Sequence, residues 1–403
     1  MNQAMQATGD NLQPIRLAQP VWIGVGVVAA VSALACAAGS LSNPRQFYFS
    51  YLTAWLFGIS LGVGALFWIM LHYLSGATWS IVVRRQWENI AISVLPLALL
   101  FVPILLGLKY LYEWAQPVYP GAVDTLAHKR AYLNTSRFAI FAVVFLAGWC
   151  WMAFRLRLWS MNQDLTGDPE YSRLPRWHSA TGMIFLALST TVAAFDWIMS
   201  LEPHWTSTMY GVYFWAGAIV GSLALLIVVV TALRGVGILR HTVTAEHLHD
   251  LGKLLFAFVI FWAYIAFCQY FLIWYANVSE ETPWYLHRLA GSWRWFALAL
   301  PIGHFIVPFL ILLRRDTKRQ PLVLGLAAAW VLAFHYIDLY WQVLPTLHRD
   351  GAQPHWLDAA TLLFMCSVVA GAVLYGLTRA ALVPLRDPGL VPLAAVPEGA
   401  KSS

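Results

Sequence analysis

Ten long apolar runs constrain the fold of this chain more than any other feature of its sequence. Each is close to the roughly 20 residues that a helix needs to cross a hydrocarbon core about 30 Å thick. Strands of a membrane barrel would be about half as long and would alternate apolar with polar residues, so the runs predict helices. They cover residues 21–41, 51–75, 89–111, 132–156, 180–200, 208–233, 254–277, 292–313, 321–344 and 357–378.

The composition agrees with a chain that lies mostly in lipid. Hydrophobic residues make up 60% of it and charged residues 11%, whereas about 25% of a typical soluble domain is charged. The first run ends in ALACAAGS, which resembles a signal-peptide cleavage site or a lipid attachment site at Cys36. Only Arg16 precedes that run and nine runs follow it, so we expect an uncleaved first helix. The sequence therefore predicts an all-α integral membrane protein with ten transmembrane helices.

The positions of the basic residues predict how these helices are oriented. Of the 25 Lys and Arg residues, 17 lie in the termini and in the loops on the same side as the termini, and 8 lie on the opposite side. By the positive-inside rule, both termini then face the cytoplasm. The net charge of +6 is explained by this basic cytoplasmic side, and it gives no indication of a nucleic-acid partner.

We expect a single membrane domain, residues 21–380. A cytoplasmic N-terminal segment, residues 1–20, precedes it. The tail, residues 381–403, contains four Pro residues and is expected to be disordered in the cytoplasm.

Short matches between the two halves of the domain suggest a duplication. Asp196 ends the fifth run and Asp338 ends the ninth, and a Pro follows each Asp seven residues later. Likewise, Arg137 begins the fourth run and Arg294 the eighth. The pattern predicts two parallel four-helix bundles, the first over 51–200 and the second over 208–344, flanked by the first and tenth helices. Parallel repeats also occur in transporters, so the duplication leaves the function open.

Local sequence also predicts where helices pack closely and where they bend. GISLG at 58–62 and GAIVG at 217–221 are pairs of small residues four apart, which let helices approach one another. Pro96 and Pro103 are expected to kink the third helix and to free carbonyl groups for polar partners.

The ninth predicted helix carries a polar stripe. His335, Asp338 and Gln342 have the spacing i, i+3, i+7, which places them within about 60° of one another around the helix. An Asp at this depth costs about 2.5–3.5 kcal/mol to insert. A functional role, in which Asp338 shares a proton with the neighbouring imidazole, is favoured, and an internally satisfied hydrogen-bond cluster is the alternative.

A second group of titratable residues lies at the end of the fifth helix, in AAFDWIMSLEPHWTSTMYG. Asp196 is expected at membrane depth with Arg137 as its counter-charge, either as a structural ion pair or as a proton acceptor beside a hydroxylated ring. Glu202 and His204 follow it on the side opposite the termini. They are candidates for a proton exit, and each taken singly is as well explained as a solvated loop residue.

The sequence indicates no metal ligands of its own. The four Cys residues stand alone and no CxxC or CxxCH motif occurs, so neither an iron–sulfur cluster nor a covalently bound c-type haem is expected. His304 lies within the eighth helix and could pair with His335 around a b-type haem. A hydrogen-bonding or proton-relay role is favoured for it.

Two loops carry clustered charges that favour simpler interpretations. In EHLHD at 246–250, the acids at the start of the seventh helix complement its dipole, and this interpretation is favoured over metal binding. Glu280, Glu281, His287 and Arg288 form the loop between the seventh and eighth helices. A docking surface or a lid is favoured there over a catalytic pair.

Four segments of the chain resemble a known family of membrane subunits. They are FDWIMSLEPHW at 195–205, STMYGVYF at 207–214, the stretch from EHLHDLGKLL to ETPWYLHR at 246–288, and HYIDLYWQVLP at 335–345. Their residues and order resemble the ActF subunits of bacterial alternative complex III, a quinol:cytochrome c oxidoreductase. The match covers most of helices five to nine. Helices one to four and ten resemble the family mainly in hydropathy.

The resemblance implies a fold, a location and partners. ActF subunits are similar to NrfD and polysulfide-reductase membrane subunits, which implies two four-helix bundles in the bacterial inner membrane. The implied partners are a related ten-helix NrfD-like subunit, an iron–sulfur subunit, multihaem and monohaem c-type cytochromes, small membrane subunits and a terminal oxidase. Quinol oxidation in such complexes is attributed chiefly to the related ten-helix subunit. For the ActF-like chain, the resemblance implies a quinone pocket and proton conduction, with Asp196, Glu202, His204, His335 and Asp338 as candidates.

Three hypotheses follow for the function. The chain is a membrane subunit of an electron-transfer complex that handles quinol or its protons, a proton-coupled secondary transporter, or a purely structural anchor of a redox complex. The first is favoured by the resemblance and by the polar groups at membrane depth. Catalysis by the chain alone is not expected.

Overall fold

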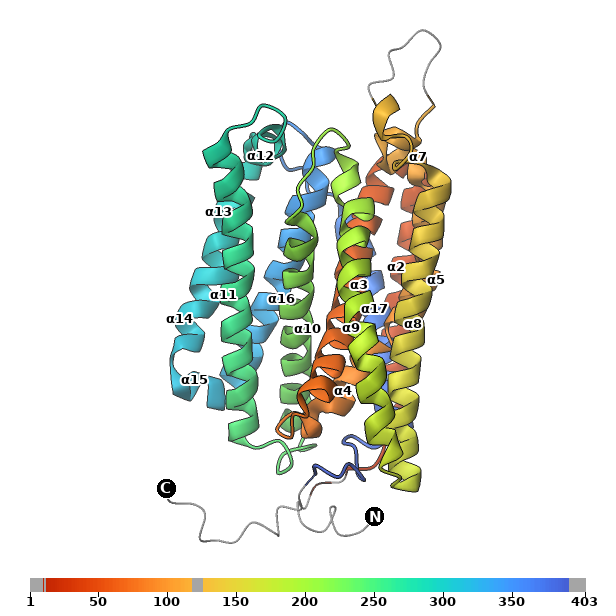
Figure 1. Cartoon of the computed structure of the whole chain (residues 1–403), viewed down its shortest axis with the longest axis vertical. Coiled ribbons are helices and arrows are strands. Elements are labelled where there is room, and N and C mark those ends of the chain that lie inside the picture. The colour runs from red at the N-terminus through yellow and green to blue at the C-terminus, as the bar shows by residue number, and fades with distance from the viewer. Residues whose placement is uncertain (1–9, 11, 118–125, 391–403) are drawn as a thin grey trace.

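The fold consists of helices that run along one common axis (Figure 1). The computed structural model describes residue 10 and residues 12–117 and 126–390, and all of their regular secondary structure is helical. Ten helical segments in this part of the chain are long and apolar enough to cross a membrane. Each coincides with one of the ten predicted runs, so the prediction of an all-α, multi-pass membrane protein is confirmed.

Six of these segments are single long helices, and four are interrupted or end in a short turn. The first six segments contain α2 (Gln19–Ser42), α3 (Pro44–Ser75), α4 (Ile81–Ala91) with α5 (Val94–Leu99) and α6 (Val102–Leu106), α8 (Thr135–Thr166), α9 (Glu170–Trp197) with η3 (Met199–Leu201), and α10 (Tyr210–Gly235). The remaining four contain α11 (Ala245–Ala276), α13 (Trp293–Ala299) with η4 (Leu300–Ile306) and α14 (Val307–Leu313), α16 (Pro321–Val343) with η5 (Leu344–Thr346), and α17 (Trp356–Arg379). Shorter elements connect them: α7 (Leu108–Leu111), η1 (Glu113–Ala115), η2 (Ala127–Lys129), α12 (Pro283–Leu289) and α15 (Arg315–Arg319).

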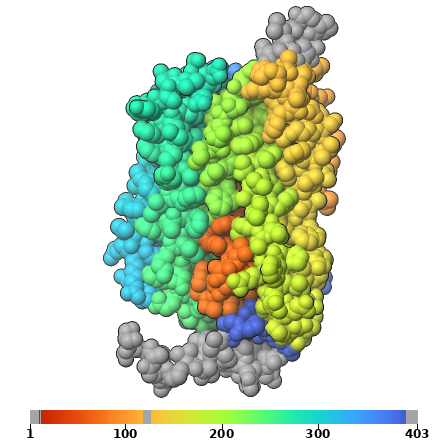
Figure 2. Space-filling model, in the orientation of Figure 1, coloured from red at the N-terminus to blue at the C-terminus, as the bar shows by residue number. Residues whose placement is uncertain are grey.

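Helices α3 and α10 form the centre of the molecule. In α3, 94% of the most apolar 18-residue window is buried inside the protein, against 11% in α2 at the periphery. Helix α3 packs against α4, α9, α10 and α17, and α10 packs against α3, α9, α11 and α16. Figure 2 shows α8, α9 and α11 side by side across one face of the molecule. The core therefore lies where the second and sixth spans meet.

Glycine permits the close approach of these two central helices. Gly64 of α3 lies directly against the backbone carbonyl of Ala218 and the hydroxyl of Ser222 on α10, so a Cβ at this position would collide with both. The two predicted pairs of small residues also lie at close contacts. Gly62 packs on Val94 of α5, and Gly217 and Gly221 are described with the site below.

The predicted break in the third span is present. Helix α4 ends at Ala91, and the chain continues as α5 and α6, which contain Pro96 and Pro103 respectively. Two carbonyl groups along this broken helix accept hydrogen bonds from side chains of α3. Trp55 Nε1 donates to the carbonyl of Leu97 at 2.8 Å, and the Tyr51 hydroxyl donates to that of Leu100 at 2.7 Å. The interruption therefore holds the third span against the central helix.

The two ends of the described chain meet at the same end of the bundle. The backbone of Ile15 pairs with Leu377, and that of Leu382 pairs with Leu12. Leu382 and Val383 are buried, so the first part of the tail predicted to be disordered is packed against the helices. This segment packs against the helices because its side chains after Arg379 are largely apolar, and burial removes them from water. Residues 391–403, the rest of that predicted tail, lie outside the described residues.

The contact between α3 and α10 leads to a prediction about stability. Gly64→Ala should lower the free energy of unfolding by about 3 kcal/mol, because the added methyl group has rigid backbone in its way. Gly26→Ala on α2, where no atom lies within 4 Å of the new Cβ, should change it by less than about 1 kcal/mol and in the stabilising direction. Unfolding of both variants in detergent micelles measures the difference. Equal stabilities would contradict the central role of this contact.

Candidate functional site

The polar stripe predicted on the ninth span is buried in the centre of the molecule. His335, Asp338 and Gln342 are each 1% exposed, and all three lie on α16. Their side chains contact α10 and α3. The Tyr210 hydroxyl of α10 donates to Gln342 Oε1 at 2.8 Å. The three residues therefore share one face, as their spacing predicted.

Asp338 is held by two aromatic donors. The Tyr213 hydroxyl donates to Asp338 Oδ1 at 2.5 Å, and Trp262 Nε1 donates to Oδ2 at 3.1 Å. Among the described residues, no Lys, Arg or His forms an ion pair with this carboxyl group. Arg294, which the duplication places in the position of Arg137, lies away from it, stacked on Trp295. Asp338 is therefore a membrane-depth carboxyl group neutralised by no neighbouring cation.

His335 occupies a space that two glycines leave free. Its ring lies against Gly217 and Gly221 of α10, where a Cβ on either glycine would approach the imidazole closely. Its Nε2 is 2.8 Å from the Ser60 hydroxyl of α3. The small residues predicted to bring helices together thus make room for this imidazole, which joins α16 to both central helices.

His304 lies in a distorted part of the eighth span. Residues Leu300–Ile306 form a π-helix, a geometry that often occurs at functional sites. The His304 ring is fully buried and stacks on Trp262 with centroids 3.9 Å apart, and neither of its nitrogens has a hydrogen-bond partner in the described structure. His304 and His335 contact different groups, and neither lines the pockets of about 530 Å³ and 350 Å³ in the described part of the chain.

A pocket of about 530 Å³ lies beside Asp338, between α11, α12, α13, η4 and α16. We call it the aromatic pocket. Tyr213 and Trp262, the two donors to Asp338, line it, together with Tyr270, Tyr285, Phe267, Phe305, Trp341, Pro301 and Arg294. A ring-shaped apolar ligand would fit such a lining. The side chains of Tyr213 and Trp262 thus connect the carboxyl group of Asp338 to the pocket.

The predicted pairing of Arg137 with Asp196 is confirmed. Arg137 Nη1 donates to Asp196 Oδ1 at 2.9 Å, and Asp196 is 2% exposed. The guanidinium group also stacks over Tyr132 at 3.5 Å from the ring centroid. Burial and the nearby Asp196 carboxylate raise the pKa of Tyr132 to about 12. The first acid of the sequence motif is therefore locked in an ion pair at the end of α8.

Glu202 belongs to a different cluster from Asp196. Its carboxylate accepts from Arg288 Nη1 at 2.7 Å and lies 3.2 Å from His287 Nδ1. Arg288 also donates to the carbonyl of Gln342 at the end of α16. Burial opposes ionisation of Glu202, but the charges of Arg288 and His287 lower its pKa below the ordinary value. Sequence reasoning treated these residues as two separate loops, and the structure joins them.

His204 does not reach either acid. It is 57% exposed at the side chain, and its nearest acidic partner is Glu113, whose carboxylate is 3.8 Å away and 54% exposed. The three titratable residues of the sequence motif therefore have three separate environments. Their closeness in sequence does not assemble one site.

A charged cluster at the opposite end of the molecule was missed by sequence reasoning. Arg84, Arg85 and Glu88 on α4 are all buried. Arg85 Nη1 lies 2.9 Å from Glu88 Oε2, and Arg85 Nη2 pairs with Asp164. Arg84 Nη1 lies 2.6 Å from Asp387 Oδ2. The spacing i, i+3, i+4 in RRQWE was a signal for such pairing.

His247, near the start of α11, has a structural role. Thr244 and His247 form a capping box, in which His247 Nδ1 accepts from the Thr244 backbone at 3.1 Å, and Glu246 pairs with Arg319. The described residues contain no group of three or more His, Cys, Asp or Glu that could hold a metal ion.

Comparison with known proteins leaves the family unassigned. No protein-family model matches the chain, and no curated protein matches it.

The Glu202 cluster yields a prediction about stability and pH. Glu202→Gln should lower the free energy of unfolding by about 3 kcal/mol at pH 7, because it leaves the buried Arg288 without its carboxylate. Since the pKa of Glu202 is lowered in the folded protein, this stabilisation is present above the ordinary pKa of Glu, about 4.3. It should be lost as the pH falls through the lower folded-state value.

The matched control is Glu113→Gln, which removes an exposed pair and should change stability by less than about 1 kcal/mol. Thermal unfolding of both variants between pH 3 and 8 provides the comparison. A Glu202 variant as stable as the Glu113 variant at pH 7 would show that the cluster contributes nothing.

Proposed function

We propose that this chain is a membrane subunit of a bacterial quinol:cytochrome c oxidoreductase of the alternative complex III type. Its role is to bind quinone, conduct protons, or both, without a metal cofactor of its own. The observation that carries the proposal is the position of Tyr213 and Trp262. Both line the aromatic pocket and both donate to the buried carboxyl group of Asp338.

The chemistry of this arrangement suits a hydroxylated ring. A quinol ring in the aromatic pocket would pack against aromatic side chains, and its hydroxyl group could approach that of Tyr213. When such a ring gives up electrons to a partner's redox centre, a proton must leave with them. The Tyr213 hydroxyl could accept that proton and pass its own to Asp338. Asp338 suits this role better than Asp196, which Arg137 already neutralises.

The wider proposal follows the resemblance described above. The chain would lie in the bacterial inner membrane with both termini in the cytoplasm and with two four-helix bundles, residues 51–200 and 208–344. Its partners would be a related ten-helix subunit, an iron–sulfur subunit, c-type cytochromes and small membrane subunits. A subunit that binds quinol needs such partners under this proposal, because electrons from quinol require an acceptor.

The partner proposal is tested by purification of the affinity-tagged chain in mild detergent, followed by mass spectrometry. Multihaem cytochrome and iron–sulfur subunits should be recovered in fixed ratios. A chain that purifies alone, folded and stable, would refute the proposal, and proton-coupled solute uptake into liposomes would then test the transporter hypothesis.

The site proposal is tested by Asp338→Asn in the intact complex. Loss of a group that takes part in proton transfer should reduce quinol:cytochrome c turnover or proton release at least tenfold, and Tyr213→Phe should reduce it in the same direction. Tyr336→Phe is the control, since Tyr336 lies on the same helix but its hydroxyl group faces Asp358. Wild-type turnover per assembled complex in Asp338→Asn would mean that the carboxyl group has only a structural role.

A further inference from the structure

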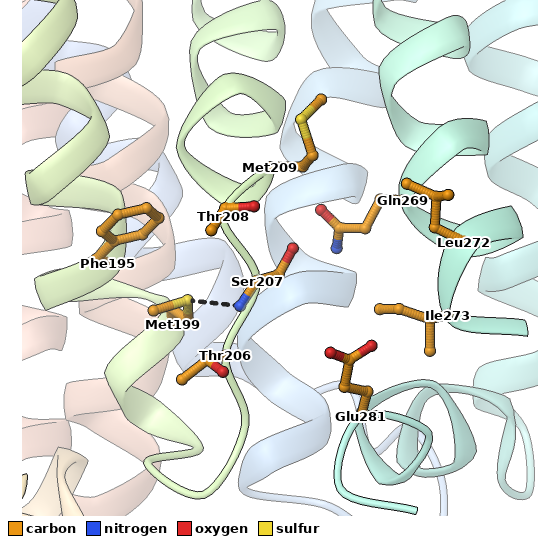
Figure 3. Close-up of a pocket in the computed structure, with 10 residues that line it drawn as sticks. All are labelled: Phe195, Met199, Thr206, Ser207, Thr208, Met209, Gln269, Leu272, Ile273 and Glu281. Carbon is orange, nitrogen blue, oxygen red and sulfur yellow. Dashed lines mark hydrogen bonds between the residues drawn. The ribbon is translucent and has the colours of Figure 1, made fainter. Parts of the chain in front are cut away.

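A second pocket, of about 350 Å³, lies between the end of α9, the segment 206–209 and the end of α11 (Figure 3). We call it the interfacial pocket. Helix α9 ends at Trp197, α10 begins at Tyr210 and α11 ends at Ala276, so the pocket lies where three spans reach their ends. Headgroups of lipids occupy this depth in a bilayer.

Gln269 of α11 indicates that the interfacial pocket receives a polar ligand. The residue is 2% exposed, and neither its amide nitrogen nor its amide oxygen has a hydrogen-bond partner within 3.5 Å in the described structure. The Tyr285 hydroxyl group is near enough only for a weaker interaction with this amide. Figure 3 shows the amide directed across the pocket toward Ser207 and Thr208. Because a buried amide without partners is costly, a bound group that donates to it and accepts from it would stabilise this arrangement.

The polar groups on one side of the interfacial pocket favour a positively charged ligand group, and those on the other side favour a negatively charged one. Glu281 lines it with a carboxylate, and this residue forms no ion pair with the rest of the described chain. On the other side are the hydroxyl groups of Thr206, Ser207 and Thr208, followed directly by the start of α10. No side chain caps the first turn of this long helix, whose N-terminal amides favour negative charge. The pocket thus complements a ligand with one positive and one negative group.

The remaining walls are apolar and reach the outer surface. Phe195, Ile273 and Leu272 line the pocket, and Leu272 is 56% exposed on the outside of α11. A ligand there could extend a hydrocarbon chain along the helices. These apolar walls favour an amphipathic ligand over a small polar solute.

We propose that the interfacial pocket binds the headgroup of a zwitterionic phospholipid with a primary ammonium group, of the phosphatidylethanolamine class. The ammonium group would pair with Glu281. The phosphate would accept from the Gln269 amide and the adjacent hydroxyl groups, beside the N-terminal end of α10, which favours negative charge. This site is independent of the aromatic pocket and of the quinol function proposed above.

Native mass spectrometry of the delipidated full-length chain tests the proposal. Phosphatidylethanolamine should bind about tenfold more tightly than phosphatidylglycerol or phosphatidylcholine, since the former lacks the ammonium group and the latter its N–H donors. Glu281→Gln should abolish most of this preference. Gln269→Leu, which keeps the side-chain volume, should weaken phosphatidylethanolamine binding at least fivefold while the thermal unfolding temperature without lipid stays the same or rises.

Glu280→Gln is the matched control, because this acid is adjacent in sequence but does not line the pocket, and it should retain wild-type binding and preference. Equal lipid affinities in the wild type, Glu281→Gln and Gln269→Leu would overturn the proposal. Soluble glycerophosphoethanolamine, added as a competitor, should displace the lipid only at far higher concentration. Displacement at equal concentration would refute a lipid and indicate a water-soluble phosphoethanolamine compound instead.

Discussion

The close packing of α3 against α10 is the contact on which the rest of the structure depends. Without a Cβ at Gly64, the two central helices approach to backbone contact, and without side chains at Gly217 and Gly221, α16 can insert His335 beside them. In lipid, helix association relies on such close fits, because no hydrophobic force favours one apolar surface over another. Small residues thus determine where the large polar ones can be buried.

The buried acids differ in whether a neighbouring cation neutralises them. Arg137 neutralises Asp196, and Arg288 neutralises Glu202 while bonding the end of α16. Asp338 instead interacts with neutral side chains, among them Tyr213 and Trp262, and both of these reach a pocket. Ion-paired acids hold helices together, whereas a carboxyl group bonded only by neutral donors retains chemistry that a ligand or proton can use.

The two halves of the chain use similar sequence signals for different purposes. Asp196 and Asp338 stand at matching places in the predicted repeat, and so do Arg137 and Arg294. Only the first pair meets, because Arg294 lies at the aromatic pocket and Asp338 faces α10 and α11. The distorted η4 helix, which carries Pro301 and His304, belongs to the second half alone among these paired spans. At these matched positions the two halves therefore place their acids in different surroundings.

The sequence by itself determined the ten helices, the break near Pro96 and Pro103, the shared face of His335 and Asp338, and the pairing of Arg137 with Asp196. These features follow from hydropathy, helical period and depth, which are local properties of the chain. Only the tertiary structure decided that Glu202 pairs with Arg288 rather than with its neighbours, that Leu382 and Val383 pack under the bundle, and that RRQWE forms a buried cluster. It also decided that Gln269 is buried without a hydrogen-bond partner within 3.5 Å. These outcomes depend on which helices become neighbours, and that choice rests on side-chain fit between distant segments, which neither hydropathy nor spacing records.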